Sequence, residues 1–125
     1  MNDQRKTIRP TIPTIMESPS AMEQFQNQCL RPILKLQNEL LIAIVRHYLE
    51  KRKIDLAKME ETKKVQQLTH SISKDGRMRG LLFGAVVGQF TLEEWETYRT
   101  QEGECNRRIT QLLTQRLVSQ LEAFS

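Results

Sequence analysis

Apolar residues recur at steps of three and four over most of the chain, and this spacing predicts an all-α fold. One stripe runs from residue 33 to about residue 56, and a second phase begins at Val65. A single helix over 33–73 would be about 60 Å long. We therefore expect either a break near residue 60 or a helix that protrudes into an oligomer. Pro32 predicts a kink within a helix pair over 20–73.

The C-terminal segment carries a further apolar stripe and predicts one long helix over 92–123. Thr91 and Glu94 form the sequence of a capping box at its start. Two charged residues, Glu102 and Arg116, fall on the apolar side of this stripe. Since an unpaired charge on a buried face is costly, we expect each of them to have a partner of opposite sign.

Between these helices, residues 79–90 read RGLLFGAVVGQF and place Gly80, Gly84 and Gly88 four residues apart. Residues at this spacing share one face of a helix. Each glycine costs a helix about 0.5–1 kcal/mol relative to alanine, so the three glycines require a compensating interaction. We expect the close approach of another backbone, from the same chain or from a second copy. The segment predicts a short helix over 77–90, with a strand over 81–90 as the alternative.

Asp75 and Gly76 predict the end of the preceding helix, with Gly76 in the left-handed position that follows many helices. Arg77 and Arg79 come next, in the first turn of the glycine-bearing helix, where positive charge opposes the helix dipole. An anion at this point would meet two guanidinium groups and free backbone N–H groups. Arg77 and Arg79 are therefore candidate anion-binding residues.

The density of proline in residues 1–19 predicts an extended or disordered N-terminal arm. The alternative hypothesis is that this arm packs against a partner subunit. A helical domain follows over 20–125, and Ser20 with Glu23 forms the sequence of a capping box at its start. The apolar and aromatic content is low for a compact monomer. We therefore expect an elongated helical bundle that oligomerisation completes, with a dimer as the default.

The net charge is +4 and the isoelectric point about 9.3, too mildly basic to imply nucleic-acid binding without further evidence. The charge is uneven. Residues 46–64 carry seven basic and four acidic side chains, whereas 92–104 carries five acidic side chains and one arginine. These segments could face each other within one chain or between two. Pairs at i,i+4, such as Lys51 with Asp55, would make the basic segment a self-paired solvated face.

The sequence contains no recognisable catalytic or metal site. His47 and His70 are isolated, and neither a Cys-x-x-Cys pair nor a glycine-rich phosphate loop is present. We therefore predict that the protein is not an enzyme and needs no cofactor. Two distant cysteines, Cys29 and Cys105, fit a reducing compartment. Since no apolar run approaches the roughly 20 residues that span a bilayer, we expect a cytoplasmic protein.

These patterns predict a small interaction or scaffold protein that acts as a homo-oligomer. We expect Phe90 to pack against Trp95 at the start of the last helix, and we include Trp95 in the predicted interface. The alternatives are a nucleic-acid-associated regulator that uses the basic segment 46–79, or a protein that binds a small anionic ligand at Arg77 and Arg79. The predicted helix-packing and oligomer-interface residues are Gly80, Gly84, Gly88, Phe83, Val87 and Trp95.

Overall fold

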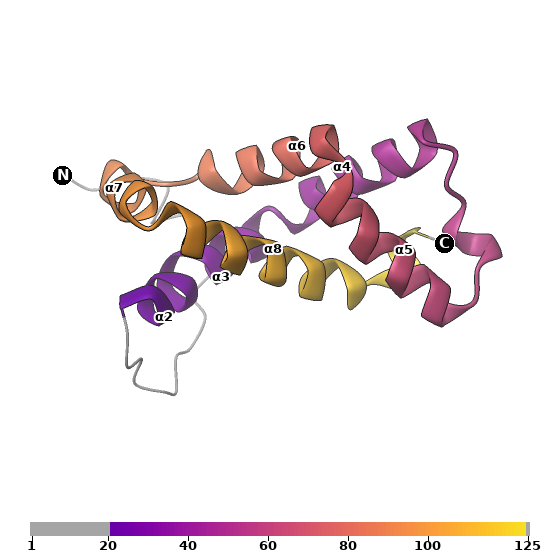
Figure 1. Ribbon diagram of the computed structural model, residues 1–125, viewed down its shortest axis with the longest axis horizontal. Helices are drawn as coiled ribbons and strands as arrows, with labels where there is room; N and C mark the ends of the chain where they lie inside the picture. Colours follow the sequence, from indigo (N-terminus) through magenta and orange to yellow (C-terminus); the bar gives the residue numbers. More distant parts are fainter. Residues whose placement is uncertain (1–20, 125) are drawn as a thin grey trace.

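The computed structural model of the protein describes residues 21–124, and within that range it contains helices and no strand (Figure 1). The prediction of an all-α fold is confirmed, and the strand alternative for 81–90 is wrong. The predicted arm over 1–19 and the Ser20 cap lie outside the described residues. In chain order the helical elements are α2 (Ala21–Phe25), a π-helical turn (Gln26–Leu30), α3 (Arg31–Leu36), α4 (Asn38–Lys51), a 3-10 turn (Leu56–Lys58), α5 (Glu61–Lys74), α6 (Gly76–Val87), α7 (Leu92–Thr100), α8 (Glu102–Val118) and a last 3-10 turn (Leu121–Phe124).

The predicted irregularity near Pro32 takes the form of a π-helical turn between α2 and α3. The Arg31 N–H donates to the carbonyl oxygen of Gln26, five residues earlier. Because proline has no N–H and its ring crowds the preceding turn, a wider turn at this point accommodates it. A second bend follows at Gln37, where φ is −92° and ψ is 7°, and it separates α3 from α4.

The chain breaks between α4 and α5, as one of the two alternatives for residues 33–73 predicted. Lys53 follows the end of α4 and has a φ of 59°, in the left-handed region. The Asp55 side chain then accepts a hydrogen bond from the Ala57 N–H at 3.1 Å and caps the short 3-10 turn. Since Asp55 lies outside the helix, the predicted i,i+4 pair between Lys51 and Asp55 does not form. The Lys51 ammonium lies 6.0 Å from the centre of the Tyr48 ring instead.

A single extended residue, Asp75, separates α5 from α6. The prediction that Gly76 ends α5 in a left-handed conformation is wrong. None of the described glycines has a positive φ, and Gly76 is the first residue of α6. The Asp75 carboxylate accepts a hydrogen bond from the Met78 N–H at 3.2 Å, so this residue acts as the N-terminal cap of α6.

The last predicted helix is two helices, because the chain bends at Gln101, where φ is −131° and ψ is 38°. Figure 1 shows α7 running at a steep angle to α8. The predicted capping box at the start of α7 is confirmed: Thr91 Oγ1 accepts from the Glu94 N–H at 3.1 Å, and the Glu94 carboxylate accepts from the Thr91 N–H at 2.9 Å. Glu102 is exposed in the first turn of α8. The prediction that it lies on the apolar side of the helix is therefore wrong.

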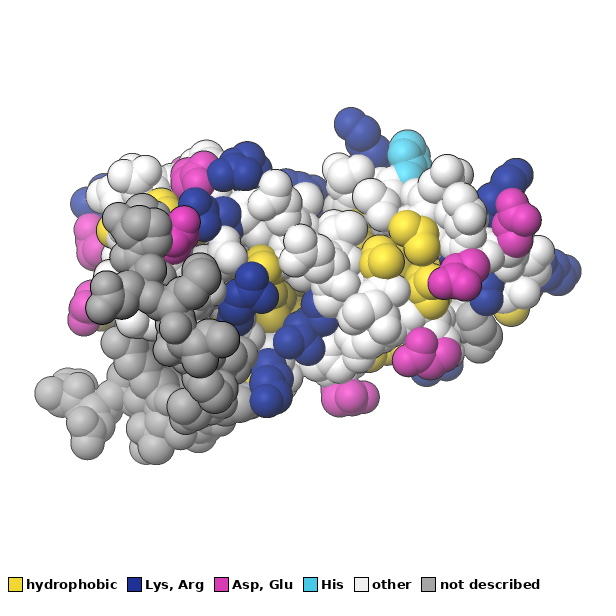
Figure 2. All heavy atoms as spheres, turned by 90° about the horizontal axis from the view of Figure 1, so that it is seen from below, with side chains coloured by type: hydrophobic (Ala, Val, Ile, Leu, Met, Phe, Trp, Pro, Cys, Tyr) yellow, Lys and Arg dark blue, Asp and Glu magenta, His cyan; other side chains and the backbone are white. Residues whose placement is uncertain are grey.

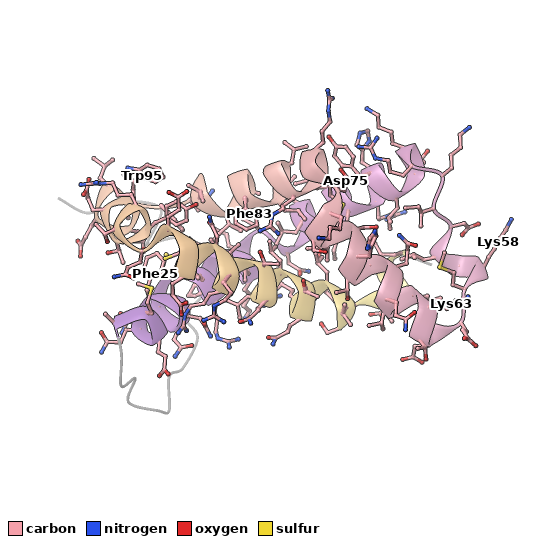
Figure 3. All side chains as sticks on the ribbon, in the orientation of Figure 1. Phe25, Lys58, Lys63, Asp75, Phe83 and Trp95 are labelled. Carbon is pink, nitrogen blue, oxygen red and sulfur yellow. The ribbon has the colours of Figure 1, made fainter. Side chains whose placement is uncertain are left out.

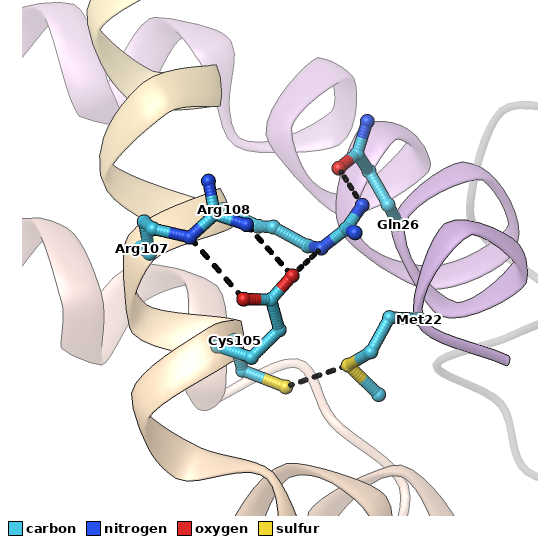
Figure 4. Close-up of polar contacts among 6 residues, drawn as sticks. Met22, Gln26, Cys105, Arg107 and Arg108 are labelled. Atoms are coloured by element: carbon cyan, nitrogen blue, oxygen red, sulfur yellow. Dashed lines mark hydrogen bonds and ion pairs between the residues drawn. The ribbon is translucent and has the colours of Figure 1, made fainter. Parts of the chain in front are cut away.

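The core extends along the molecule between α8 and the other helices, and α8 packs against both α5 and α7. At one end, α8 also holds the first helical segment (Figure 4). Arg108 donates to the Gln26 side chain at 2.8 Å and pairs with Glu104 at 2.8 Å, and the Cys105 thiol lies 3.7 Å from the Met22 sulfur. Residues with no exposed surface include Leu30, Ile33, Leu41, Val45, Leu68, Ile72, Met78, Leu82, Val86, Ile109, Leu113 and Leu117.

Candidate functional site

Helix α6 has one fully buried side and one side on which backbone is exposed. Met78, Leu82 and Val86 are spaced four residues apart and are completely buried. Gly80 and Gly84 are each two residues away from these positions, which places them on the opposite side of the helix, and both are exposed. We call the exposed surface of α6 at Gly80, Gly84 and Gly88 the glycine face.

Nothing in the described chain requires glycine at positions 80 and 84. A Cβ atom added at Gly80 or at Gly84 would have no neighbouring atom within 4 Å. The close approach that the sequence predicts is therefore not made by another helix of the same chain within residues 21–124. The other expected source of a close contact, a second copy, stays a prediction.

Gly88 has a local explanation that the other two glycines lack. It ends α6, and its N–H donates to the Gly84 carbonyl at 2.8 Å. A Cβ atom at Gly88 would lie 2.8 Å from that same oxygen, so any other residue would force the backbone to shift. Of the three glycines, therefore, Gly88 is required by a local steric contact, whereas Gly80 and Gly84 are not.

Two exposed leucines lie beside the glycine face. Leu81 is 51% exposed on α6, and Leu40 is 48% exposed on α4. The Gln37 side chain donates to the Ala85 carbonyl at 3.0 Å, which fixes how the two helices meet. Leu40 is three residues after Gln37 and Leu81 is four before Ala85, so helical spacing places each leucine on the side of its helix that carries this hydrogen bond.

The other predicted interface residues divide into two groups. Phe83 and Val87 are partly buried and pack against the core along α6. Trp95 is 43% exposed on α7, at the end of the molecule, whereas Phe83 lies near its middle (Figure 3). The Trp95 ring stacks on Tyr98 at 5.5 Å, and the rings next to Phe90 are those of Phe25 and Tyr98, both at 5.8 Å. Trp95 therefore lies beyond the C-terminal end of α6, and its part in the interface stays a prediction.

The structure gives little support to an anion at Arg77 and Arg79. The Asp75 carboxylate already occupies the N-terminal end of α6, and its negative charge would repel an anion. A hydrogen bond and ion pair with Arg52, with the two side chains 3.0 Å apart, lowers the pKa of Asp75 and keeps it ionised. The Arg79 guanidinium lies over the Phe83 ring, 4.5 Å from its centre. The anion site at these two arginines stays a prediction.

The basic and acidic segments lie at opposite ends of the molecule. Figure 3 shows Lys58 and Lys63 at one end and Trp95 of α7 at the other. The basic segment 46–64 and the acidic segment 92–104 therefore cannot neutralise each other within one chain. Binding of nucleic acid to 46–79 stays a prediction, and within that segment Arg52 is already paired with Asp75.

No arrangement typical of catalysis is formed by the described residues. Cys29 and Cys105 are both buried, and burial raises the pKa of the Cys105 thiol, which disfavours the reactive thiolate. Residues 21–124 contain no cluster of three or more His, Cys, Asp or Glu side chains that could hold a metal ion. No helix in that range is both long enough and apolar enough to cross a membrane.

No protein-family model matches the chain, and no curated protein or solved structure is significantly similar to it. We therefore infer function from the geometry of the chain itself. Sequence patterns identified the glycines but not the exposed leucines beside them. Leu81 and Leu82 are adjacent in one apolar run, and only the buried positions 78 and 86 show which of the two faces inward.

Proposed function

We propose that the protein is a small helical interaction protein that acts through self-association, with two copies docking on the glycine faces of their α6 helices. The observation that carries this proposal is that Gly80 and Gly84 are exposed and have no steric reason within the described chain to be glycine. Two glycines in an exposed helix cost about 1–2 kcal/mol relative to alanine. A partner helix that approaches the bare backbone offsets this cost through close packing.

The apolar surface around the glycine face supports the same proposal. Leu40 and Leu81 are each about half exposed and would lose that contact with water against a second copy. A partner helix could pack closely against the backbone at the glycines and bury the apolar side chains beside them. Because the surface is built from one element and its neighbour, two copies can present it to each other in a symmetric dimer.

The distribution of charge favours an antiparallel arrangement of the two copies. The net positive segment 46–64 and the net negative segment 92–104 lie at opposite ends of the molecule, with α6 between them (Figures 1 and 3). If two α6 helices pair antiparallel, each acidic α7 points toward the basic end of the other copy. Opposite charges then face each other between chains, which adds attraction and fixes the orientation.

The double variant Gly80→Ala with Gly84→Ala separates a role in folding from a role in association. The variant is expected to raise the free energy of unfolding of the monomer by about 1–2 kcal/mol, since alanine is the better helix former and the added methyl groups meet nothing. Its self-association is expected to weaken, because the two methyl groups keep the partner helix away. Urea denaturation at low protein concentration and sedimentation velocity measure the two effects.

Gly103→Ala is the matched control, because Gly103 is also exposed in a helix and a Cβ there would also meet nothing within 4 Å. This variant should stabilise the monomer, and it should leave association unchanged because it alters no charge of the acidic segment 92–104. If the double variant associates as tightly as the unmodified protein, the glycine face is not the interface and the proposal fails.

A further inference from the structure

A second feature, separate from the glycine face, lies between α3 and α8. A hollow of about 340 Å³ opens there, with the buried side chains of Leu34 and Leu112 among its lining. Two arginines, Arg31 from α3 and Arg116 from α8, also line it, together with neutral polar side chains and no carboxylate. Figure 2 shows the face seen from below, where several Lys and Arg side chains gather near the middle. We call this feature the arginine hollow.

Neutral groups, and not an acid, hold Arg116 in place. Its guanidinium donates to the Asn38 side-chain oxygen at 3.3 Å. Asn38 and Gln120 are in turn joined by two side-chain hydrogen bonds, both at 2.9 Å. The partner of opposite sign predicted for Arg116 is therefore absent from the described residues. A guanidinium has five N–H donors, so the bond to Asn38 orients the group and leaves most of its donors for another acceptor.

Arg31 is held in a similar way, since its Nε donates to the Asn27 side-chain oxygen at 3.1 Å. Four other arginines among the described residues differ from this pair. Arg52, Arg99, Arg107 and Arg108 each form an ion pair with a carboxylate, at distances from 2.7 to 3.0 Å. Arg31 and Arg116 thus bring two positive charges into one hollow with amide oxygens as their acceptors.

The two charges act on each other. Burial lowers the pKa of Arg116, and the positive charge of Arg31 lowers it further. Two like charges that line one hollow, one of them partly buried, repel each other. An anion between them would remove this repulsion and accept hydrogen bonds from both guanidinium groups, which suit phosphate oxygens in geometry as well as in charge.

We propose that the arginine hollow binds a phosphate monoester, with Arg31 and Arg116 holding the phosphate and Leu34 and Leu112 contacting an apolar part of the ligand. A dianionic phosphate matches the two positive charges of the hollow. The Gln115 side chain, exposed at the rim, can add a neutral hydrogen bond. This inference uses none of the residues of the glycine face and does not depend on self-association.

Calorimetric titration of the full chain with phenyl phosphate, and with inorganic phosphate, tests the proposal. Saturable binding of phenyl phosphate is expected, and it should weaken about tenfold or more in Arg31→Gln and in Arg116→Gln, since each variant loses a charge-assisted contact. Inorganic phosphate should bind more weakly, because it cannot contact the leucines. Arg107→Gln, which removes a carboxylate-paired arginine from the same helix, should bind like the unmodified protein.

Vesicles of phosphatidylcholine with and without phosphatidic acid distinguish a lipid headgroup from a soluble phosphate as the source of the monoester. Binding only to vesicles that contain phosphatidic acid, and lost in Arg116→Gln, would assign the site to a lipid. The melting temperature of unliganded Arg116→Gln should not fall, because that change removes one of two repelling charges. The proposal is overturned if none of the phosphate probes binds, or if all four proteins bind them equally.

Discussion

Gly84→Leu is expected to convert the proposed dimer into monomers while leaving the helical fold intact. The added side chain meets no atom of its own chain near the Cβ position, and leucine is a good helix former. At the interface it would separate the two backbones. Overpacking of this kind costs about 1–3 kcal/mol at each site. In a symmetric dimer the substitution occurs twice, so the dissociation constant should rise roughly 30-fold or more.

Sedimentation velocity over a range of concentrations gives the dissociation constant, and circular dichroism checks that the helices remain. Gln111→Leu is the control, because it adds the same apolar side chain to an exposed position on α8, away from α6. Its association should match that of the unmodified protein. A Gly84→Leu protein that dimerises normally would place the interface elsewhere and contradict the proposed docking surface.

Leu82→Ala is expected to destabilise the fold by about 2–5 kcal/mol, the usual cost of removing a large apolar side chain from a packed core. Leu82 is fully buried at the centre of the inward side of α6, between Met78 and Val86. The total stability of a domain is only about 5–15 kcal/mol, so this one change removes a large fraction of it. Urea denaturation should show a lower midpoint, measured at a concentration where the protein is monomeric.

The adjacent residue provides the control for this prediction. Leu81 is half exposed, so Leu81→Ala should change the free energy of unfolding by only about 0.5 kcal/mol. It should instead weaken association, since it removes apolar surface beside the glycine face. Equal destabilisation by the two substitutions would mean that α6 is oriented differently about its axis from the arrangement described above.

The sequence predicted the helices better than it predicted their ends. The Thr91 capping box could be foreseen because both of its partners lie within four residues and need no tertiary contact. The break between α4 and α5 could be foreseen because the apolar phase changes there. The bend at Gln101 was missed, because the apolar residues on either side of it remain in phase and therefore indicated one continuous helix.

The candidate sites show the same division between local and distant causes. The spacing of Gly80, Gly84 and Gly88 is visible in the sequence, but spacing does not show that the Gly80 and Gly84 positions are open while Gly88 is fixed by a neighbouring carbonyl. The arginine hollow depends on Arg31 and Arg116, which are far apart in the chain and meet only after folding. The sequence marked Arg116 as an unusual charge, yet it predicted an acidic partner where the structure has Asn38.

The measurement that tests self-association most directly is equilibrium sedimentation of the unmodified protein at micromolar concentrations in low salt. One chain has a mass of 14.7 kDa. We expect twice that mass, with partial dissociation as salt screens the attraction between the oppositely charged ends. A mass of 14.7 kDa at every concentration would contradict self-association and leave the exposed glycines of α6 without an explanation.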